Sequence, residues 1–535
     1  MSQIQQPNNN NNSSSTSIFL QKKDNFQNNQ EEKLENKLQS RQEQFSNEEN
    51  FSQIKESAIS QELSLGENNI NKIFLQKRLN KITNNENNLS LYNVLKIPKN
   101  IYIQLTNEEI NIRDFSKIIN LFHSQNIDEK FKGLIGIRKL LSLEPNCPIQ
   151  EIIELKLVPE LISLLDNPLY EFIYEATYCL CNIASGTEDQ ANTLLIFGGI
   201  PKILNILDNP VEEIKSQTIW LVSNLVSNSA KIRDTLIEQK ILDKILTILA
   251  STNNEKYINL STWCISNFFK VKPIPNYNIC TRAFKIIARV VLIDTKENDD
   301  FISDSCSFIS ILSQKYKEFN QEIIDTGVLQ KIIKYLDIKK KNILKPCLRI
   351  VGNIACTDNA NHTQSLIDLG VLDKLKYSLY NESENIRKET AFILSNIASG
   401  TQKQIEALID QNLIQILYKK FNNEKPKVKK EAFIAIANMT AVEDEKYMKK
   451  VLDDNILIII SELLKNEDIN FIIIGLESLS NILAFGERKG KKKEFSLECE
   501  KMGILDSLEK LQTNENQIVY DKTLKILETF FEIED

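Results

Sequence analysis

The sequence predicts an all-α protein built as a solenoid of stacked helical repeats. Three observations predict it: apolar residues recur with a helical period from about Thr106 onward, strand-like alternation is absent there, and one asparagine recurs at a nearly constant spacing. The spacing decides the class, because recurrence at roughly 40 to 47 residues with two or three helices per unit is typical of an α-solenoid.

Residues 1–90 differ in composition from the rest of the chain. They are rich in Asn, Gln and Ser, begin with an asparagine run at residues 8–12, and carry ten Lys or Arg against eleven Asp or Glu. Such a segment cannot bury enough apolar surface to offset its ordering entropy. We therefore expect a mostly disordered, low-complexity tail over residues 1–90 and a folded solenoid over residues 91–535.

The repeat is marked by an asparagine near the end of each third apolar stretch. Successive gaps are 42, 43, 86, 43, 42 and 43 residues, and the gap of 86 is a double step whose missing member falls near Ile311. The recurring asparagines are Asn182, Asn224, Asn267, Asn353, Asn396, Asn438 and Asn481.

Residues 198–227, GGIPKILNILDNPVEEIKSQTIWLVSNLVS, show the layout of one repeat. Gly198 and Gly199 open a turn, and Pro201 begins a helix, because its fixed φ and missing N–H suit the first turn. A second turn then leads into a longer helix that carries Trp220 and Asn224. The order of short helix, turn and long helix favours the armadillo type over the HEAT type.

Charge and cysteine content disfavour some classes of function and location for this protein. The net charge of −7 weighs against a nucleic-acid binder that works by bulk attraction, and it leaves room for a basic ligand. Nine cysteines without a CxxC pair predict reduced thiols and no disulfide. No signal peptide is visible and no run approaches about 18 uninterrupted apolar residues, so we expect a soluble intracellular protein without membrane insertion.

An enzyme has little support in the sequence. The two histidines, His123 and His362, lie far apart without a ligand-spaced cluster, and no G-x-G-x-x-G or Walker-type loop is present. We therefore expect no catalytic residue, no metal site and no cofactor.

Stacking should align the recurring asparagines in a row on the inner surface. A carboxamide has two donor hydrogens and an acceptor, so each could bond the N–H and C=O of one residue of an extended peptide. Four residues earlier, on the same helix face, an aromatic precedes four of them. Consecutive rings should form slots for the stem of a Lys or Arg, with a cation–π attraction of about 0.5 to 2 kcal/mol. These aromatics are Tyr178, Trp220, Trp263 and Phe392.

A single pair of this kind is more often structural, with the ring in the core and the asparagine in solvent or bonded between repeats. Recurrence at a fixed offset in four units favours the peptide-binding interpretation.

Several segments resemble the importin α family of armadillo adaptors, which recognise nuclear localisation signals. They include RKLLSLEPNCPI at residues 138–149, NIASGT at 182–187, IWLVSN at 219–224 and TWCISNFFKVKP at 262–273. Further likeness lies in CLRIVGNIA at 347–355 and GILDSLEKLQTNENQIVY at 503–520. The resemblance implies a right-handed solenoid of about ten armadillo repeats.

The resemblance also implies two signal-binding grooves. Asn228 lies where the family has an aspartate that pairs with the key signal lysine, so one charge partner is lost. Arg349 would separate two cation-binding stretches. The implied major groove comprises Ser142, Tyr178, Asn182, Gly186, Gln217, Trp220, Asn224, Asn228, Trp263 and Asn267. The implied minor groove comprises Arg349, Asn353, Phe392, Asn396, Glu431 and Asn438.

The implied partners are basic signal peptides of cargo proteins, importin β and a nuclear export receptor, with residence in cytoplasm and nucleus. The importin-β-binding segment is only faintly matched at residues 22–44, where Lys22, Lys23, Lys33, Lys37 and Arg41 are diluted by acids. An acidic end with Glu528, Glu532 and Asp535 is the candidate contact for the export receptor.

Two functions therefore stay open. One is a nuclear import adaptor that links cargo to importin β; the other is an armadillo-repeat interaction scaffold without a transport role. The basic runs ERKGKKKE at 487–494 and IKKK at 338–341 are interpreted as solvated loops in either case.

Overall fold

A computed structural model describes residues 99–107, 112–143, 147–293 and 298–531. Every regular element in these ranges is a helix, which confirms the predicted all-α class. The described residues form two compact units, the first ending at Ile350 and the second beginning at Val351. The predicted tail over residues 1–90, and Glu532 and Asp535 at the other end, lie outside the described residues.

The first unit begins with helix α3 and ends inside α19, which contains the boundary between units. Its helices are α3 (Lys99–Asn107), η1 (Ile112–Asp114), α4 (Phe115–Phe122), α5 (Ile127–Leu140), α6 (Ile149–Glu154), α7 (Leu157–Ser163), η2 (Leu164–Asp166), α8 (Tyr170–Ala184), α9 (Glu188–Ile196), α10 (Gly199–Ile206), α11 (Glu212–Asn228), α12 (Ala230–Glu238), α13 (Ile241–Ser251), α14 (Glu255–Lys270), α15 (Tyr277–Leu292), α16 (Asp299–Lys315), α17 (Glu318–Asp325), α18 (Val328–Tyr335) and α19 (Lys341–Ala355).

The second unit continues the same pattern from the end of α19. Its helices are α20 (Ala360–Asp368), α21 (Val371–Ser378), α22 (Glu384–Ala398), α23 (Gln402–Asp410), α24 (Leu413–Phe421), α25 (Pro426–Met439), α26 (Glu445–Asp453), α27 (Ile456–Leu464), α28 (Ile469–Arg488), α29 (Lys492–Lys501), α30 (Ile504–Leu511) and α31 (Gln517–Phe530).

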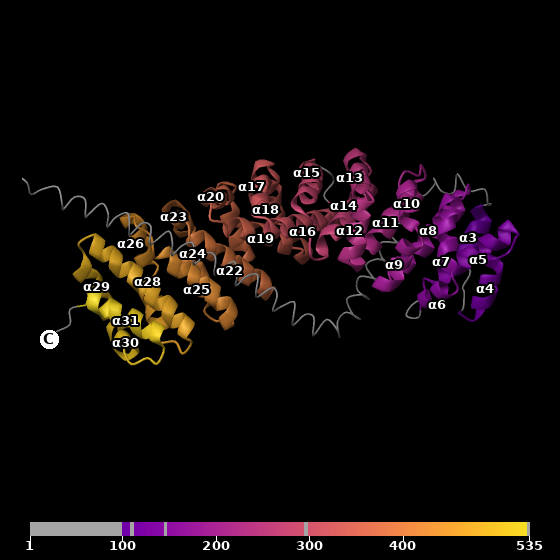
Figure 1. Cartoon of the computed structure of the whole chain (residues 1–535). Coiled ribbons are helices and arrows are strands. Elements are labelled where there is room, and N and C mark those ends of the chain that lie inside the picture. Colours follow the sequence, from indigo (N-terminus) through magenta and orange to yellow (C-terminus); the bar gives the residue numbers. More distant parts are fainter. Residues whose placement is uncertain (1–98, 108–111, 144–146, 294–297, 532–535) are drawn as a thin grey trace, which may run out of the picture. The chain divides into compact units, whose positions relative to one another are not determined.

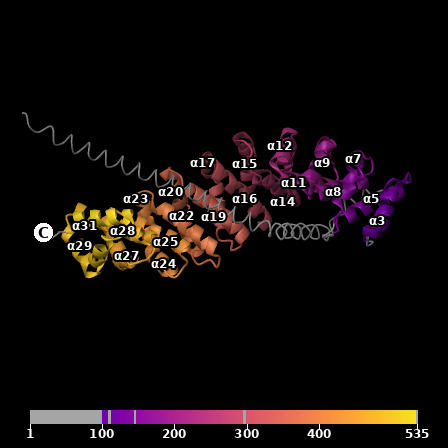
Figure 2. The same ribbon diagram turned by 60° about the horizontal axis from the view of Figure 1, so that its bottom comes forward.

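Within each unit, the long third helix of one repeat packs on the third helix of the next. In the first unit α5, α8, α11, α14 and α16 lie in this order (Figure 1), and in the second unit α22, α25, α28 and α31 do the same (Figure 2). Counting third helices from α5 to α31 gives ten repeats, and α15 replaces the usual two short helices in the fifth. The prediction of about ten armadillo-type repeats is therefore confirmed.

Repeat stacking buries an apolar core that no repeat could form alone. Helix α11 is an example of a third helix that lies between its neighbours. Its apolar residues are found on several sides of the helix, and Ile214, Leu221, Val222 and Leu225 are fully buried. The predicted long helix carrying Trp220 and Asn224 is this element. The short helix before it begins at Gly199, two residues before Pro201.

The residue before each second helix has a left-handed backbone. This position turns the chain from the first helix of a repeat into the second, and it has a positive φ in all eight three-helix repeats. The residues there are Lys156, Gly198, Lys240, Gly327, Gly370, Asn412, Asn455 and Gly503.

One described helix, α28, is long and apolar enough to cross a membrane by length and composition. Sixty-one per cent of its apolar window is buried inside the protein, as in the core helix of a soluble protein.

Candidate peptide-binding face

The recurring asparagines of the first unit join consecutive third helices. Asn182 Nδ2 donates to Ser142 Oγ at 3.0 Å, and Asn224 Nδ2 donates to the carbonyl oxygen of Cys181 at 3.0 Å. Asn267 Nδ2 donates to Ser223 Oγ at 2.8 Å. We call these three residues the first asparagine row, and each of its bonds spans one repeat.

The second unit repeats this arrangement. Asn396 Nδ2 donates to Cys356 Sγ, Asn438 Nδ2 to the carbonyl oxygen of Ser395, and Asn481 Nδ2 to Thr440 Oγ1. These asparagines form the second asparagine row.

Inter-repeat bonding is therefore a real role of both rows. The bond between repeats is made by Nδ2 of each carboxamide and does not use its acceptor Oδ1. The Oδ1 of Asn267 instead accepts from Lys270. Asn182 and Asn224 are half-buried, so a peptide can still reach them. Asn267 is buried, and Asn396 is only 2% exposed with no partner for its Oδ1 among the described residues. Access to the rows is thus uneven.

The rings do not form the open slots that the sequence suggested. Trp220 is 6% exposed and its ring centre lies 5.3 Å from that of Trp263, with the planes tilted by 58°. An aliphatic stem between two rings needs about 7 Å, which is twice a carbon–carbon contact. The expectation of a slot between Trp220 and Trp263 is therefore wrong. Trp263, which is half-buried, keeps part of its surface exposed.

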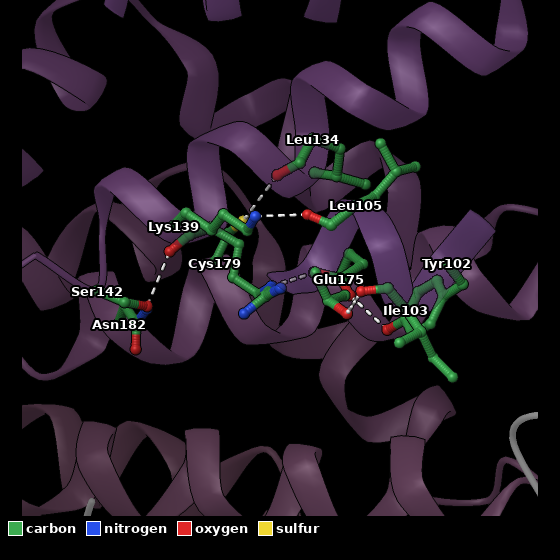
Figure 3. Close-up of polar contacts among 11 residues, drawn as sticks. Tyr102, Ile103, Leu105, Leu134, Lys139, Ser142, Glu175, Cys179 and Asn182 are labelled. Carbon is green, nitrogen blue, oxygen red and sulfur yellow. Dashed lines mark hydrogen bonds and ion pairs between the residues drawn. The ribbon is translucent and has the colours of Figure 1, made fainter. Parts of the chain in front are cut away.

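The guanidinium of Arg138 lies over the ring of Tyr178. Arg138 lies 40 residues before Tyr178, at the ring position of the first repeat, and its guanidinium carbon is 5.2 Å from the ring centre. Arg138 Nε also donates to Glu175 Oε2 at 2.5 Å, and Tyr102 Oη donates to Glu175 Oε1 at 2.6 Å. Figure 3 shows Tyr102 of α3 reaching Glu175, with the Ser142–Asn182 contact at the opposite side of the view. This cluster anchors α3 to the first repeats.

Burial of this cluster raises the pKa of its tyrosine hydroxyls. Burial, reinforced by the charge of Glu175, raises the pKa of Tyr102 well above its usual value. Burial also raises the pKa of Tyr178 to about 12, against the opposing effect of Arg138. Both phenols stay protonated at neutral pH, so Tyr102 remains a donor to the Glu175 carboxylate.

A second cation of the chain lies on the first asparagine row. Lys270 Nζ donates to Asn267 Oδ1 at 3.1 Å and lies 3.9 Å from Asp304 Oδ1. The side chain of Asp304 is 13% exposed. Cations of this protein therefore already contact one ring and one carboxamide of the face.

Asn228 is held by its own repeat and the preceding one. Its Nδ2 donates to the carbonyl oxygens of Ala184 at 2.8 Å and Asn224 at 3.0 Å, which uses both N–H hydrogens. Only its neutral Oδ1 remains for a ligand.

A local hydrogen bond explains why a glycine stands at position 186. Thr187 and Gln190 form a capping box, and the Gln190 side chain returns to the backbone N–H of Thr187 at 3.0 Å. A Cβ on Gly186 would lie 2.3 Å from Gln190 Oε1. Gly400 stands in the same relation to Gln404, within a second copy of the NIASGT segment at residues 396–401.

The other expected residues of the major groove differ in access. Ser142 is exposed, whereas Gln217 is buried, so of the two only Ser142 is accessible from solvent.

The expected minor-groove residues divide between the two units. Arg349 belongs to the first unit and Asn353 to the second, and both are half-buried. Glu431 and Asn438 are half-buried as well, and Glu431 Oε2 accepts from Ser395 Oγ at 3.5 Å. Phe392 is buried, so its ring does not offer an open face.

Arg138 and Glu175 also belong to the face, although neither was predicted to do so. The signal was available for Arg138, because it occupies the ring position one repeat before Tyr178. It was not available for Glu175, whose role depends on α3 folding back onto α8. Among the described residues no group of three His, Cys, Asp or Glu side chains could hold a metal ion.

Comparison with known proteins supports this architecture. A family described as an atypical Arm repeat matches residues 493–535. Importin subunit alpha-3 of Arabidopsis thaliana is 31% identical over 460 residues, which cover 76% of this chain and 78% of that protein. Importin subunit alpha-1b of Oryza sativa subsp. japonica is 31% identical over 479 residues, covering 77% and 81%. The chain belongs to the importin α family.

Other similarities agree with membership of the importin α family. Importin subunit alpha-B of Dictyostelium discoideum is 36% identical over 252 residues, covering 46% of this chain and 48% of that protein. The crystal structure of an engineered protein matches with a TM-score of 0.65 at 20% identity, over 79% of this chain and all of that one. This last likeness concerns the fold alone. The relatives are importin subunits rather than enzymes.

Proposed function

We propose that this importin α is a nuclear import adaptor that binds lysine-rich localisation signals on the third-helix face of its first unit. The observation that carries the proposal is that two cations of the chain already bind there. Arg138 stacks on Tyr178, and Lys270 bonds the carboxamide of Asn267. A face that accommodates these side chains has the chemistry to accommodate ligand lysines.

Asn182 and Asn224 are the carboxamides that we expect to hold the peptide backbone. Each keeps one donor hydrogen or one acceptor for the ligand after its inter-repeat bond, and each is half-buried rather than buried. A net hydrogen bond of this type contributes about 0.5–1.5 kcal/mol.

Trp263 supplies the apolar surface for a lysine stem. Because Trp220 packs against it, the stem lies over the exposed part of Trp263 rather than between two rings. A cation–π contact there is worth about 0.5–1 kcal/mol at a partly exposed site. The absence of a charge at Asn228 lowers the affinity for the lysine that would otherwise pair with it.

The remaining expected residues make a second, weaker site. Asn353, Glu431 and Asn438 are the accessible ones, whereas Phe392 and Asn396 are buried and need local movement to reach a peptide. We therefore expect the first unit to provide most of the affinity. Linkage to importin β through the tail, recycling by an export receptor and residence in cytoplasm and nucleus complete the proposal.

A peptide titration tests the proposal. A lysine-rich signal peptide is titrated against the full chain and against an Asn182→Ala, Asn224→Ala variant, with a peptide whose lysines are serines as the ligand control. Loss of two carboxamides should raise Kd by about tenfold or more. Equal binding of both peptides, or equal binding by both proteins, would leave only the scaffold function.

The variant also loses two inter-repeat bonds, so a matched control is needed. Asn481→Ala removes the same kind of bond in the second unit, at a residue that is not part of the proposed site. It should lower thermal stability without changing Kd. A loss of binding in Asn481→Ala as well would show that the effect is structural.

A further inference from the structure

A small apolar patch lies at one edge of the first unit, where α6 and α9 end. Leu155 is 47% exposed, Ile196 is 68% exposed and Phe197 is 43% exposed. The two helices lie side by side and in register, because Gln190 Nε2 near the start of α9 bonds Gln150 Oε1 near the start of α6 at 3.4 Å. Leu155 and Ile196 therefore lie at the same end of neighbouring helices. We call these three residues the edge patch.

The edge patch does not continue into the next repeat. One repeat further on, 42 residues along the chain, Glu238 and Gln239 replace Ile196 and Phe197. Both are exposed, so the apolar surface ends at the next repeat. Exposed apolar residues recur at the same position at Leu369 and Met502, where the adjacent repeats carry polar residues. Among the described repeats, only in the edge patch do the apolar residues of two consecutive repeats lie together, and such a cluster marks a candidate contact surface.

Acidic side chains lie at the other end of the same two helices. They are exposed, and among the described residues none of them forms an ion pair. Glu188 precedes Ile196 by eight residues, which is about 12 Å along a helix. The acidic residues at this end are Glu151, Glu188 and Asp189. Glu154 is the last residue of α6 and lies at the same end as Leu155. The surface thus offers apolar contacts at one end and negative charge about 6 to 12 Å away.

The chain outside the described residues contains a segment with the complementary order. Residues 73–78 read IFLQKR, three apolar residues followed by a glutamine and two cations, and residues 18–23 repeat the pattern as IFLQKK. In an extended peptide, three residues from Phe74 to Lys77 span about 10 Å. That span matches the distance between the edge patch and the acidic side chains.

We propose that residues 73–78 dock on the edge patch, with Ile73, Phe74 and Leu75 on the apolar end and Lys77 and Arg78 toward the acidic end. The chain between Arg78 and helix α3 is long enough for this contact. Arg78 precedes Lys99 by 21 residues, which reach at most about 70 Å. Helix α3 packs on α5 and bonds α8, and α8 packs on α9, so the patch is only about two helix diameters, roughly 20–25 Å, from α3.

Tethering makes even a weak contact effective. A short linker gives an effective concentration of the order of millimolar, so a segment with a millimolar Kd is about half docked. Residues 73–78 are preferred over residues 18–23 because their tether is shorter by 55 residues.

Site-specific photo-crosslinking on the full chain tests the docking. The photoreactive residue p-benzoylphenylalanine replaces Phe197 in one sample and Gln239 in a matched sample, and the crosslinked peptides are identified by mass spectrometry. We expect Phe197→p-benzoylphenylalanine to crosslink the peptide containing residues 73–78 within the same chain, in at least fivefold higher yield than the Gln239 sample. Charge reversal by Lys77→Glu with Arg78→Glu should lower that yield about fivefold or more, and Lys22→Glu with Lys23→Glu should leave it unchanged.

Each other outcome would overturn the proposal. Equal yields at the two positions would mean that the patch is not a docking site. Crosslinks to residues 18–23, to another segment or to a second copy of the chain would assign the patch to a different occupant. A yield that charge reversal does not change would remove the electrostatic half of the contact. These results do not depend on signal-peptide binding, so they stand apart from the test of the proposed function.

Discussion

The guanidinium of Arg138 stacks on the ring of Tyr178, on the third helix of the next repeat, with 5.2 Å between the guanidinium carbon and the ring centre. The same guanidinium pairs with Glu175, whose side chain is 1% exposed. The contact therefore combines a cation–π interaction with a buried ion pair, and both join α5 to α8.

Arg138→Met should destabilise the first unit strongly. It leaves the buried Glu175 without its cation, and breaking a buried pair costs about 3–5 kcal/mol. Both tryptophans of the chain lie in this unit, so a urea titration followed by tryptophan fluorescence reports on it selectively. Adding Glu175→Gln to Arg138→Met should recover much of the loss, because no unpaired charge remains. Additive losses in the double variant would contradict the buried-pair explanation.

Gly186→Ala should weaken the start of α9. The new Cβ would displace the Gln190 side chain from the backbone N–H of Thr187, and loss of a cap typically costs about 1 kcal/mol. Differential scanning calorimetry should show a lower transition temperature. Gly352→Ala is the control, because its Cβ would meet Ile393 at an ordinary 3.5 Å inside α19. That variant should be neutral or stabilising, and equal losses in both would argue against the capping mechanism.

Lys156→Gly should stabilise the first unit by about 0.5–1 kcal/mol. Lys156 has a φ of 58°, a left-handed conformation that costs a residue with a Cβ about 1–2 kcal/mol. Glycine avoids this cost, but its greater backbone entropy in the unfolded chain offsets part of the stabilisation. Thermal denaturation monitored by tryptophan fluorescence measures the change. Lys285→Gly, at an exposed position within α15, should have the opposite sign and cost about 1 kcal/mol. A loss in Lys156→Gly would show that the lysine side chain has a role there.

Asn228→Asp should strengthen binding of a lysine-rich peptide by about fivefold, since a half-buried charge pair is worth about 1 kcal/mol. The gain should shrink as salt concentration rises, and isothermal titration at two salt concentrations measures it. The variant should also be less stable, because its carboxylate replaces a donor to the carbonyl oxygens of Ala184 and Asn224. Asn228→Ser controls for loss of the donor. If Asn228→Asp binds no better than Asn228→Ser, the signal lysine does not lie at this position.

Much of the fold could be predicted because a solenoid converts sequence spacing into spatial spacing. Asparagines 42 or 43 residues apart come to lie on neighbouring third helices, as the bonds of Asn224 and Asn267 to the preceding helix show. The helical period, the repeat length and the number of repeats are local or periodic properties, so the sequence determined them by itself.

The tertiary structure decided which side chains of the face are accessible. Trp220 and Trp263 occupy equivalent positions in consecutive repeats and their rings pack on each other, yet Trp220 is buried and Trp263 is half-buried. Likewise, the left-handed turn falls on Lys156 in one repeat and on Gly198 in the next, so residue identity does not reveal it. Side-chain packing between neighbouring helices depends on rotamers and on segments such as α3 that fold back from outside the repeat. Neither is encoded in the period, and this is why the row was predictable while its exposure was not.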